Sequence, residues 1–258
     1  RHGTRLMQAA EDYARERGCI AATLETTSFE ARPFYEKRGY EVFATLDDYP
    51  PGHSKFFLRK RLTAPPPDRA KSLLDFWFGP SGDPQREQHR AIWFRSTDEF
   101  DAALRREFLA DYEAAAAGTL QAWEASPEGA LALLLLLDQV PRNIFRGSPR
   151  AYATDAAARA AAEGALERGF DQLVPPAWRL FFYMPFHHSE NIGDQRRSLA
   201  LFNALPRNPD RGGSLRRYGR HYIEVIEHFG RFPHRNEILG RESTPAEIAF
   251  MAERERSS

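Results

Sequence analysis

Three groups of polar and ionisable residues each follow an apolar segment in the second half of the chain. The apolar segments are five consecutive leucines at residues 133–137, then residues 181–186 and residues 223–226. The polar groups are Asp138, Gln139, Arg142 and Asn143; His187, His188, Ser189 and Glu190; and His228, Arg231, His234, Arg235 and Asn236. A lone buried charge is costly, so buried ionisable side chains need partners. We therefore expect one shared network that joins the ends of several helices.

These groups contain two carboxylates, Asp138 and Glu190. In a shared network each of them faces an arginine of the same groups, namely Arg142, Arg231 or Arg235. An alternative interpretation is a ligand pocket in the same place. Arginine and histidine side chains around a cleft would suit an anionic ligand such as a carboxylate or a phosphate.

A metal site is a further alternative for the histidines, five of which fall between His187 and His234. His221, Glu224 and His228 follow one another at spacings of three and four, so they share one face of a helix. First-row metals use such sets of side chains. However, the sequence contains no second Glu-x-x-His element, and we predict no metal.

Composition limits the classes of protein to consider. The 258 residues include 36 basic and 36 acidic side chains, a balance that argues against nucleic acid as the main partner. The longest apolar run, residues 130–137, is far shorter than the ~20 residues of a membrane span. The single cysteine, Cys19, allows no internal disulfide, which favours a reducing, cytoplasmic setting. We expect Cys19 to pack at the start of a strand rather than to act as a nucleophile.

A boundary between two domains is predicted at residues 63–68, which read TAPPPD. Consecutive prolines cannot continue a helix, and they make a stiff extended spacer. Before this linker, short apolar segments alternate with segments of helical period, whereas nearly every later segment has helical period. The predicted fold class is therefore α+β and mostly α: a small α/β domain at residues 1–62 and an all-α domain at residues 69–258.

The first domain is expected to run helix, strand, helix, strand, strand. The predicted segments are residues 6–14 with Gly18 at the helix end, then 19–25, 29–38, 40–46 and 55–62. In the second domain, Thr97 is a good N-cap, and residues 128–140 are apolar nearly all round. We expect residues 128–140 to form a single, central, buried helix.

The first domain resembles the C-terminal half of the GCN5-related N-acetyltransferases (GNAT). The resemblance is carried by HGTRLMQAAEDYARERGC, which starts at His2, and by LETTSFEARPFYEKRGYEVF, which starts at Leu24. In that family a glycine-rich turn opens a helix whose free backbone N–H groups hold the pyrophosphate of coenzyme A. A helix N-terminus suits that task because its first amides have no intrahelical partner and its dipole is positive there.

The resemblance implies acetyl-CoA as cosubstrate and a role for four residues. Gly3 and Thr4 match the last glycine of the pyrophosphate turn and the residue after it. Ser28 matches a position near the cofactor where the family often has asparagine, and Tyr35 matches the general acid. A phenol, with a pKa ordinarily near 10, is a plausible proton donor to a departing thiolate.

The second domain resembles a bacterial all-helical family catalogued as domain of unknown function 924, whose fold is similar to tetratricopeptide repeats. The matching strings are LLDFWFG from Leu73, LLDQVPRNIFRG from Leu136, FFYMPFHHSE from Phe181 and HFGRFPHRNEILGR from His228. The resemblance supplies a fold and no reaction.

Together these observations favour acyl transfer from acetyl-CoA to an amine, by direct attack of the amine on the thioester. The family's substrate-facing strands would precede Gly3, so we expect this chain alone to lack a complete active site. The alternative is a helical binding or scaffold module that holds a peptide or a small anion. Either way we expect a small-molecule or peptide ligand, neither nucleic acid nor membrane, and an oligomeric state that the sequence leaves open.

Overall fold

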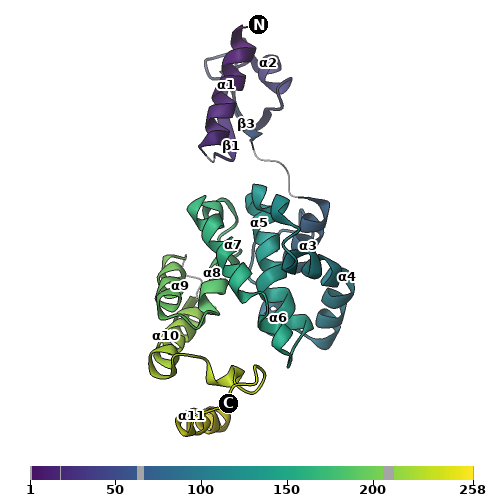
Figure 1. Cartoon of the computed structure of the whole chain (residues 1–258). Coiled ribbons are helices and arrows are strands. Elements are labelled where there is room, and N and C mark those ends of the chain that lie inside the picture. Colours follow the sequence, from purple (N-terminus) through teal and green to yellow (C-terminus); the bar gives the residue numbers. More distant parts are fainter. Residues whose placement is uncertain (1, 18, 63–66, 206–211, 258) are drawn as a thin grey trace. The chain divides into compact units, whose positions relative to one another are not determined.

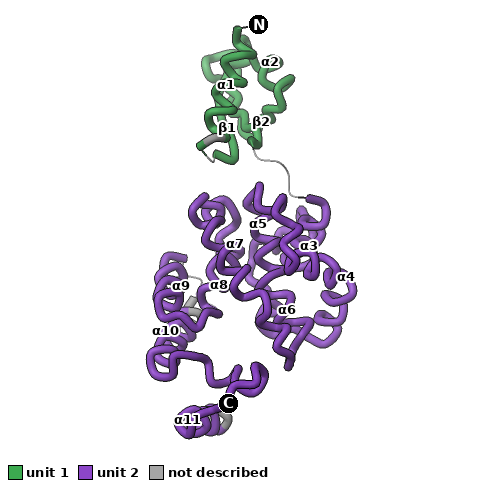
Figure 2. Tube along the Cα trace, in the orientation of Figure 1, with its two compact units in different colours: residues 1–65 green, residues 66–258 purple. Residues whose placement is uncertain are grey.

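The computed structural model describes residues 2–17, 19–62, 67–205 and 212–257. The chain divides into two compact units, unit 1 at residues 1–65 and unit 2 at residues 66–258 (Figure 2). Residues 63–66 of the predicted linker, and Gly18 as a predicted helix end, lie outside the described residues. At the other end of that linker, Asp68 is already the first residue of a helix.

Unit 1 contains two helices and three strands in the predicted order (Figure 1). These elements are α1 (His2–Glu16), β1 (Ala21–Thr27), α2 (Arg32–Glu36), β2 (Glu41–Leu46) and β3 (Lys55–Arg61). The boundaries differ from the predicted ones by at most four residues, and the largest difference is at the start of α1.

The strands of unit 1 form an antiparallel sheet in the order β1-β3-β2. Leu58 of the central strand lies opposite Leu24 on one side and Val42 on the other, and its side chain is fully buried. Helix α1 packs against this sheet, since Lys60 of β3 forms an ion pair with Glu11 of α1. This ion pair fixes α1, and with it the first turn of the helix, on the sheet.

All regular secondary structure in the described residues of unit 2 is helical, and the predicted fold class is confirmed. Its α-helices are α3 (Asp68–Phe78), α4 (Asp98–Ala116), α5 (Pro127–Leu134), α6 (Val140–Ile144), α7 (Asp155–Glu167), α8 (Leu180–His187), α9 (Ile192–Ala204), α10 (Gly212–Phe229) and α11 (Pro245–Ser257). Short 3₁₀ turns are η1 (Ala91–Trp93), η2 (Gln121–Ala125), η4 (Pro149–Tyr152), η5 (Phe170–Leu173) and η6 (Pro233–Arg235), while η3 (Leu135–Gln139) is π-helical.

The helices of unit 2 pack largely as neighbours in the chain, with α7 on α8, α8 on α9 and α9 on α10. Aromatic rings fill part of the core: Phe78 stacks on Trp178 with ring centroids 4.1 Å apart, and Phe181 packs edge-on against Phe78. Thr97 caps α4 as predicted, because its side chain accepts a hydrogen bond from the N–H of Phe100. Similarity of this stacking to tetratricopeptide repeats stays a prediction.

The predicted buried helix over residues 128–140 is confirmed as part of a continuous helical run from Pro127 to Ile144, but this run is not α-helical throughout. Helix α5 gives way to the π-helical turn η3, in which the N–H of Val140 bonds to the carbonyl of Leu135, five residues back. Pro141 explains the change, because its ring lacks an N–H and crowds the carbonyl four residues earlier. That carbonyl, of Leu137, instead accepts a hydrogen bond of 2.6 Å from Thr154 Oγ1. Such π turns often occur at functional sites.

Among the described residues, no helix combines the length and the apolar character needed to span a membrane.

Candidate functional sites

The first turn of α1 lies against α2 in unit 1. Gly3 and Thr4 belong to this turn, whose leading amides have no intrahelical acceptor. A Cβ on Gly3 would lie 3.2 Å from a ring carbon of Phe34, so the absence of a side chain allows the close approach. Arg38, just after α2, donates to Thr4 Oγ1 and, at 2.7 Å, to the carbonyl of Phe34. The predicted pyrophosphate residues are therefore joined to the helix that carries Tyr35.

Arg38 is a candidate site residue that the sequence analysis missed. Its guanidinium lies over the Phe34 ring at 3.5 Å, and its Nε is buried without a hydrogen-bond partner in the described residues. A guanidinium beside the positive end of a helix creates a region that favours an anion. The signal in the sequence was its spacing, since Arg38 follows Phe34 by one helical turn.

Tyr35 and Ser28 occupy different surroundings. The half-buried Tyr35 ring packs edge-on against Phe34, at 5.2 Å between centroids, and against Tyr40, at 6.0 Å. The exposed Ser28 lies by the turn before β3, where its Oγ is 3.1 Å from His53 Nδ1. The contacts of the described residues thus connect Gly3, Thr4 and Tyr35, and they leave Ser28 apart.

A buried carboxylate, Glu11, holds the core of unit 1. It accepts hydrogen bonds from Lys60 Nζ at 2.6 Å and from an Arg15 terminal nitrogen at 3.3 Å. Burial, together with the negative charge of Glu11 and its hydrogen bond, raises the pKa of Tyr40 to about 12. This cluster fastens α1 to the sheet.

In unit 2, the π-helical turn η3 places Asp138 inside the protein. Asp138 is 1 % exposed, and its carboxylate lies 2.8 Å from His188 Nδ1 at the end of α8 and 3.3 Å from Arg142 of α6. Gln139 donates to the other carboxylate oxygen at 2.6 Å. Burial opposes the charge of Asp138, but its interactions with His188 and Arg142 and the hydrogen bond from Gln139 outweigh burial and hold the pKa of Asp138 far below its usual range.

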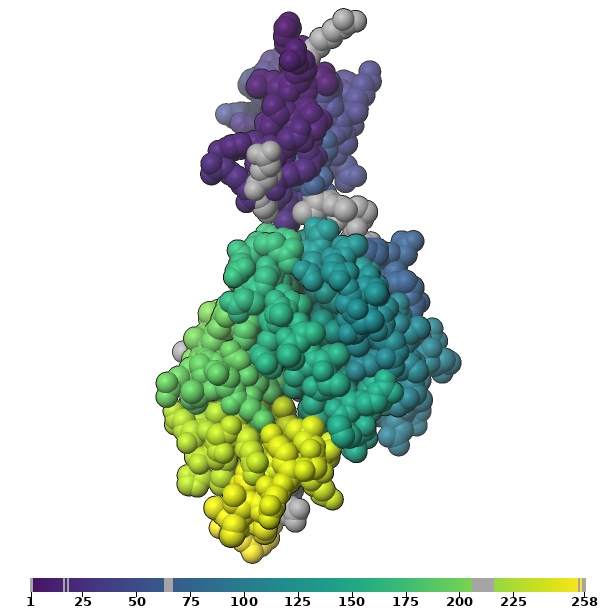
Figure 3. Space-filling view, in the orientation of Figure 1, coloured from purple at the N-terminus to yellow at the C-terminus, as the bar shows by residue number. Residues whose placement is uncertain are grey.

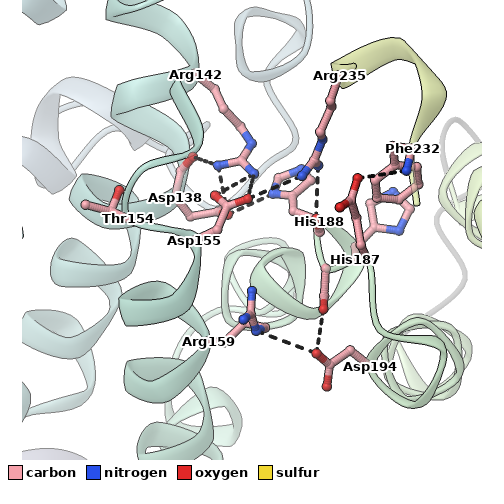
Figure 4. A network of polar contacts seen from close by, with 12 residues as sticks. Asp138, Arg142, Thr154, Asp155, Arg159, His187, His188, Asp194, Phe232 and Arg235 are labelled. Carbon is pink, nitrogen blue, oxygen red and sulfur yellow. Dashed lines mark hydrogen bonds and ion pairs between the residues drawn. The ribbon is translucent and has the colours of Figure 1, made fainter. Parts of the chain in front are cut away.

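Asp155, the first residue of α7, connects this cluster to the C-terminal part of the unit (Figure 4). Arg142 reaches Asp155 at 2.8 Å, and Arg235 of η6 reaches it at 3.4 Å. Arg235 also donates to the carbonyl of His188 at 2.9 Å. The predicted network therefore exists for Asp138, Gln139, Arg142, His188 and Arg235, with Asp155 as a member that the sequence analysis did not predict.

The predicted partner of Glu190 is wrong. Its carboxylate pairs with Arg241, at 2.7 and 2.9 Å, rather than with Arg142, Arg231 or Arg235. It also accepts the backbone N–H of Phe232 at 2.8 Å (Figure 4). Arg241 was missed because it lies beyond the third polar group, separated from it by a turn that ends at a glycine with positive φ.

Several other predicted members lie outside the network. Arg231 pairs with the buried Glu247 of α11 at 2.7 Å. Asn143 donates to Asp101 of α4 at 2.6 Å. His228 is exposed, with its ring against Phe229. Polar residues that follow an apolar segment point in several directions around the helix end, so one sequence group serves several contacts.

His187 is buried beside the network. Its ring stacks on Tyr222, with centroids 4.4 Å apart and planes 5° from parallel, and its Nδ1 has no hydrogen-bond partner in the described part of the chain. Burial, followed by the neighbouring His188, lowers the pKa of His187 to about 3. The buried Gln195 holds the end of α8, since it donates to the carbonyls of His187 and Ser189 at 2.7 and 2.6 Å.

Two further sequence expectations concern metal and thiol chemistry. His221, Glu224 and His228 line a pocket between α10 and α11, but His221 Nδ1 lies 4.0 Å from the Glu224 carboxylate. Within residues 2–17, 19–62, 67–205 and 212–257, no three metal-binding side chains are placed to hold an ion. Cys19 was expected to pack at a strand start, and this was wrong: it is exposed, ahead of β1.

Comparison with known proteins separates the two units. Residues 73–255 match the family described as "Bacterial protein of unknown function (DUF924)". A solved structure of a protein of unknown function from Agrobacterium tumefaciens is 41% identical, with a TM-score of 0.61 over 71% of this chain and 97% of that one.

Unit 1 matches a different family. Residues 1–40 match the acetyltransferase (GNAT) family. Blasticidin-S acetyltransferase from Streptomyces morookaense is 46% identical over 61 residues, which cover 23% of this chain and 45% of that protein. The chain thus spans about half the length of this curated relative.

Proposed function

The chain belongs to the bacterial DUF924 family through residues 73–255, and from the GNAT likeness of its first 40 residues we propose that unit 1 is the acetyl-CoA-binding part of an N-acetyltransferase. The acceptor would be an amine of a small polar molecule, of which blasticidin S, named for the relative, is the example to test. Transfer would require, besides unit 1, the other half of such a domain.

The joining of the α1 first turn to Arg38 carries this proposal. The leading amides of α1 would hold a diphosphate, and Arg38, fixed beside Thr4, would supply a positive charge to it. Two features fit such a ligand: Arg38 Nε is buried without a partner in the described residues, and Gly3 has no side chain to cover the amides. The hydrogen bond from Arg38 to Thr4 keeps the guanidinium beside the first turn of α1.

Tyr35 would complete the chemistry on the same helix. When bound, acetyl-CoA supplies an acetyl group activated as a thioester. As a C–N bond forms and the C–S bond breaks, we assign Tyr35 Oη the role of donating a proton to the leaving sulfur. Ser28 would at most contact the ligand from the turn that holds it, because its hydroxyl is engaged with His53 and Ser54.

Isothermal titration of the purified chain tests the binding part of the proposal. We expect coenzyme A to bind, and pantetheine, which lacks the diphosphate, to bind far more weakly. Arg38→Gln should weaken coenzyme A binding about tenfold, the effect of one charge-assisted hydrogen bond. Arg17→Gln is the matched control, because Arg17 is exposed beyond the opposite end of α1 and should bind as the wild type.

Three results would contradict the proposal in different ways. Absence of coenzyme A binding, or equal binding by Arg38→Gln and the wild type, would reject the diphosphate site. Tight binding of pantetheine would mean that the protein binds the pantetheine part of coenzyme A rather than the diphosphate. Acetylation of blasticidin S by this chain alone, followed by mass spectrometry, would reject the requirement for a second half.

A further inference from the structure

Unit 2 contains a pocket of about 340 Å³ beside the Asp138 network. Its wall comes from α6, η4, the end of α8, α10 and η6, and it includes Arg142, Arg146, Tyr152, His188, Tyr222 and Arg235. Figure 3 shows that the yellow C-terminal segment adjoins the teal and green helices on this unit. Segments about 100 residues apart in the sequence therefore meet at one pocket.

The wall of this pocket is cationic. Three arginines line it, whereas the carboxylates that pair with them are absent from its lining: Asp138 and Asp155 for Arg142 and Arg235, and Asp101 for Arg146. Arg142 and Arg235 share Asp155, at 2.8 and 3.4 Å. Two guanidiniums on one carboxylate leave hydrogen-bond donors for a second anion.

Arg235 gives an independent indication of a ligand. Its residue is 6 % exposed, yet its Nε, a strong donor, has no hydrogen-bond partner in the described residues. Buried polar groups are nearly always paired, so an unpaired donor at a pocket wall requires an explanation. An oxyanion in the pocket would supply the missing acceptor.

His188 adds a hydrogen-bond acceptor to the same wall. A carboxylate can only accept, so the 2.8 Å contact requires that His188 Nδ1 carries the hydrogen donated to Asp138. Burial, followed by the charge of Arg142, lowers the pKa of His188, so the ring is neutral at neutral pH and keeps a lone pair on Nε2. Because Nδ1 is directed at the buried Asp138, the opposite edge of the ring, with Nε2, is the edge that lines the pocket.

We propose that this pocket binds a small hydroxyl-bearing oxyanion, a phosphate or a hydroxycarboxylate. The guanidiniums of Arg142 and Arg235 hold the charged oxygens, and His188 Nε2 accepts a hydrogen bond from the hydroxyl of the same molecule. The volume suits a compact metabolite, since small-molecule pockets usually measure about 300–1,000 Å³. This site lies wholly within unit 2 and does not depend on acetyl transfer.

Matched pairs of anions test both parts of the proposal. Inorganic phosphate is compared with sulfate, and citrate with tricarballylate, by isothermal titration of the full chain at constant ionic strength. At neutral pH the first member of each pair carries a hydroxyl and the second does not. We expect phosphate or citrate to bind, and to bind about tenfold more tightly than its partner, because a site built for a hydroxyl rejects the analogue without it. The pair that binds identifies the oxyanion.

Variants connect the binding to named residues. Arg235→Gln should weaken binding at least about tenfold. Arg231→Gln is its control, because Arg231 also pairs with a carboxylate but lies outside the pocket lining. His188→Asn keeps a donor for Asp138 and removes Nε2, so it should bind both members of a pair alike. Arg146→Gln, at a wall residue 60 % exposed, serves if Arg235→Gln fails to fold.

Each outcome either supports or overturns the proposal. Weaker binding in Arg235→Gln or Arg146→Gln, with wild-type binding in Arg231→Gln, supports the site. Absence of binding by all four anions at millimolar concentration would overturn it. Equal weakening by the pocket variant and by Arg231→Gln would also overturn it, as would discrimination between paired anions that survives in His188→Asn.

Discussion

Each unit contains a buried carboxylate that lies beside two basic side chains, and these partners differ. Glu11 of unit 1 pairs with Lys60 and Arg15, which are 22 % and 37 % exposed. Asp138 of unit 2 pairs with His188 and Arg142, which are 14 % and 17 % exposed. The partners of Glu11 reach water, whereas those of Asp138 lie mostly inside the protein beside the pocket.

The two units also differ in whether the residues around the buried carboxylate belong to the candidate site. In unit 1, the Glu11 cluster fastens α1 to the sheet, while the candidate site uses other residues: the first turn of α1, Arg38 and Tyr35. In unit 2, Arg142 pairs with Asp138, His188 donates a hydrogen bond to it, and both side chains line the pocket. We therefore expect site substitutions to affect binding alone in unit 1, and binding together with stability in unit 2.

The largest expected effect is that of Asp138→Ala. Removing one partner from a buried ion pair leaves the other charges uncompensated, at a cost of about 3–5 kcal/mol. Urea unfolding followed by tryptophan fluorescence measures this cost in unit 2, because all four tryptophans lie beyond residue 66. A loss below about 1 kcal/mol, typical of an exposed pair, would show that the Asp138 cluster is no more structural than a surface contact.

The second effect is a change in the pH dependence of stability on substituting His187→Phe. The folded-state pKa of His187 is about 3, below the ordinary value of 6.5, so the folded ring stays neutral while the unfolded ring takes up a proton. Stability therefore falls as the pH drops from about 6.5 towards 3. His187→Phe removes this titrating group. The slope of the free energy of unfolding against pH should therefore decrease by about 1.4 kcal/mol per pH unit, the amount that one proton contributes.

Urea unfolding between pH 6.5 and 4.5 measures the slope, a window in which most carboxylates remain charged. His228→Gln is the control, since the exposed His228 should leave the slope unchanged. An equal slope in His187→Phe and the wild type would mean that His187 is protonated in the folded state.

Much of this arrangement could be predicted from local sequence. The spacing of apolar residues distinguished helices from strands, Thr97 marked the start of α4, and the prolines near residue 65 marked the domain boundary. These signals predicted the order of the elements and the fold class. The polar groups after apolar segments correctly indicated Asp138 with Arg142, because these residues are one helical turn apart. Such contacts depend on neighbours in the chain.

The rest depends on contacts between distant segments. Asp155 opens a helix and looks like an ordinary first-turn carboxylate, yet it joins Arg142 to Arg235, 80 residues further on. The pairing of Glu190 with Arg241 likewise depends on where the loop after η6 returns. The π-helical turn η3 could have been suspected from Pro141, but its consequence, Thr154 bonded to Leu137, requires the position of α7.

The third prediction is that Glu11→Gln costs much less than Asp138→Ala. The amide keeps one hydrogen-bond acceptor, and Lys60 and Arg15 can turn to solvent, so we expect a loss of about 1 kcal/mol. Hydrogen exchange at the amides of β3, followed by mass spectrometry, reports it, because unit 1 has no tryptophan. A loss as large as that of Asp138→Ala would remove the distinction between the two clusters.

The smallest expected effect on stability is that of Tyr35→Phe, whose ring still packs between Phe34 and Tyr40. Coenzyme A binding should change less than about twofold, within the range of a surface substitution. The thiol of bound coenzyme A should nevertheless become less reactive towards iodoacetamide at neutral pH. A hydroxyl that donates to sulfur favours the thiolate, and the variant lacks that hydroxyl.

The measurement uses a Cys19→Ser background, because Cys19 is exposed and would react. Equal reactivity in both proteins would mean that Tyr35 does not reach the sulfur, and unit 1 would then keep a diphosphate site without an acid.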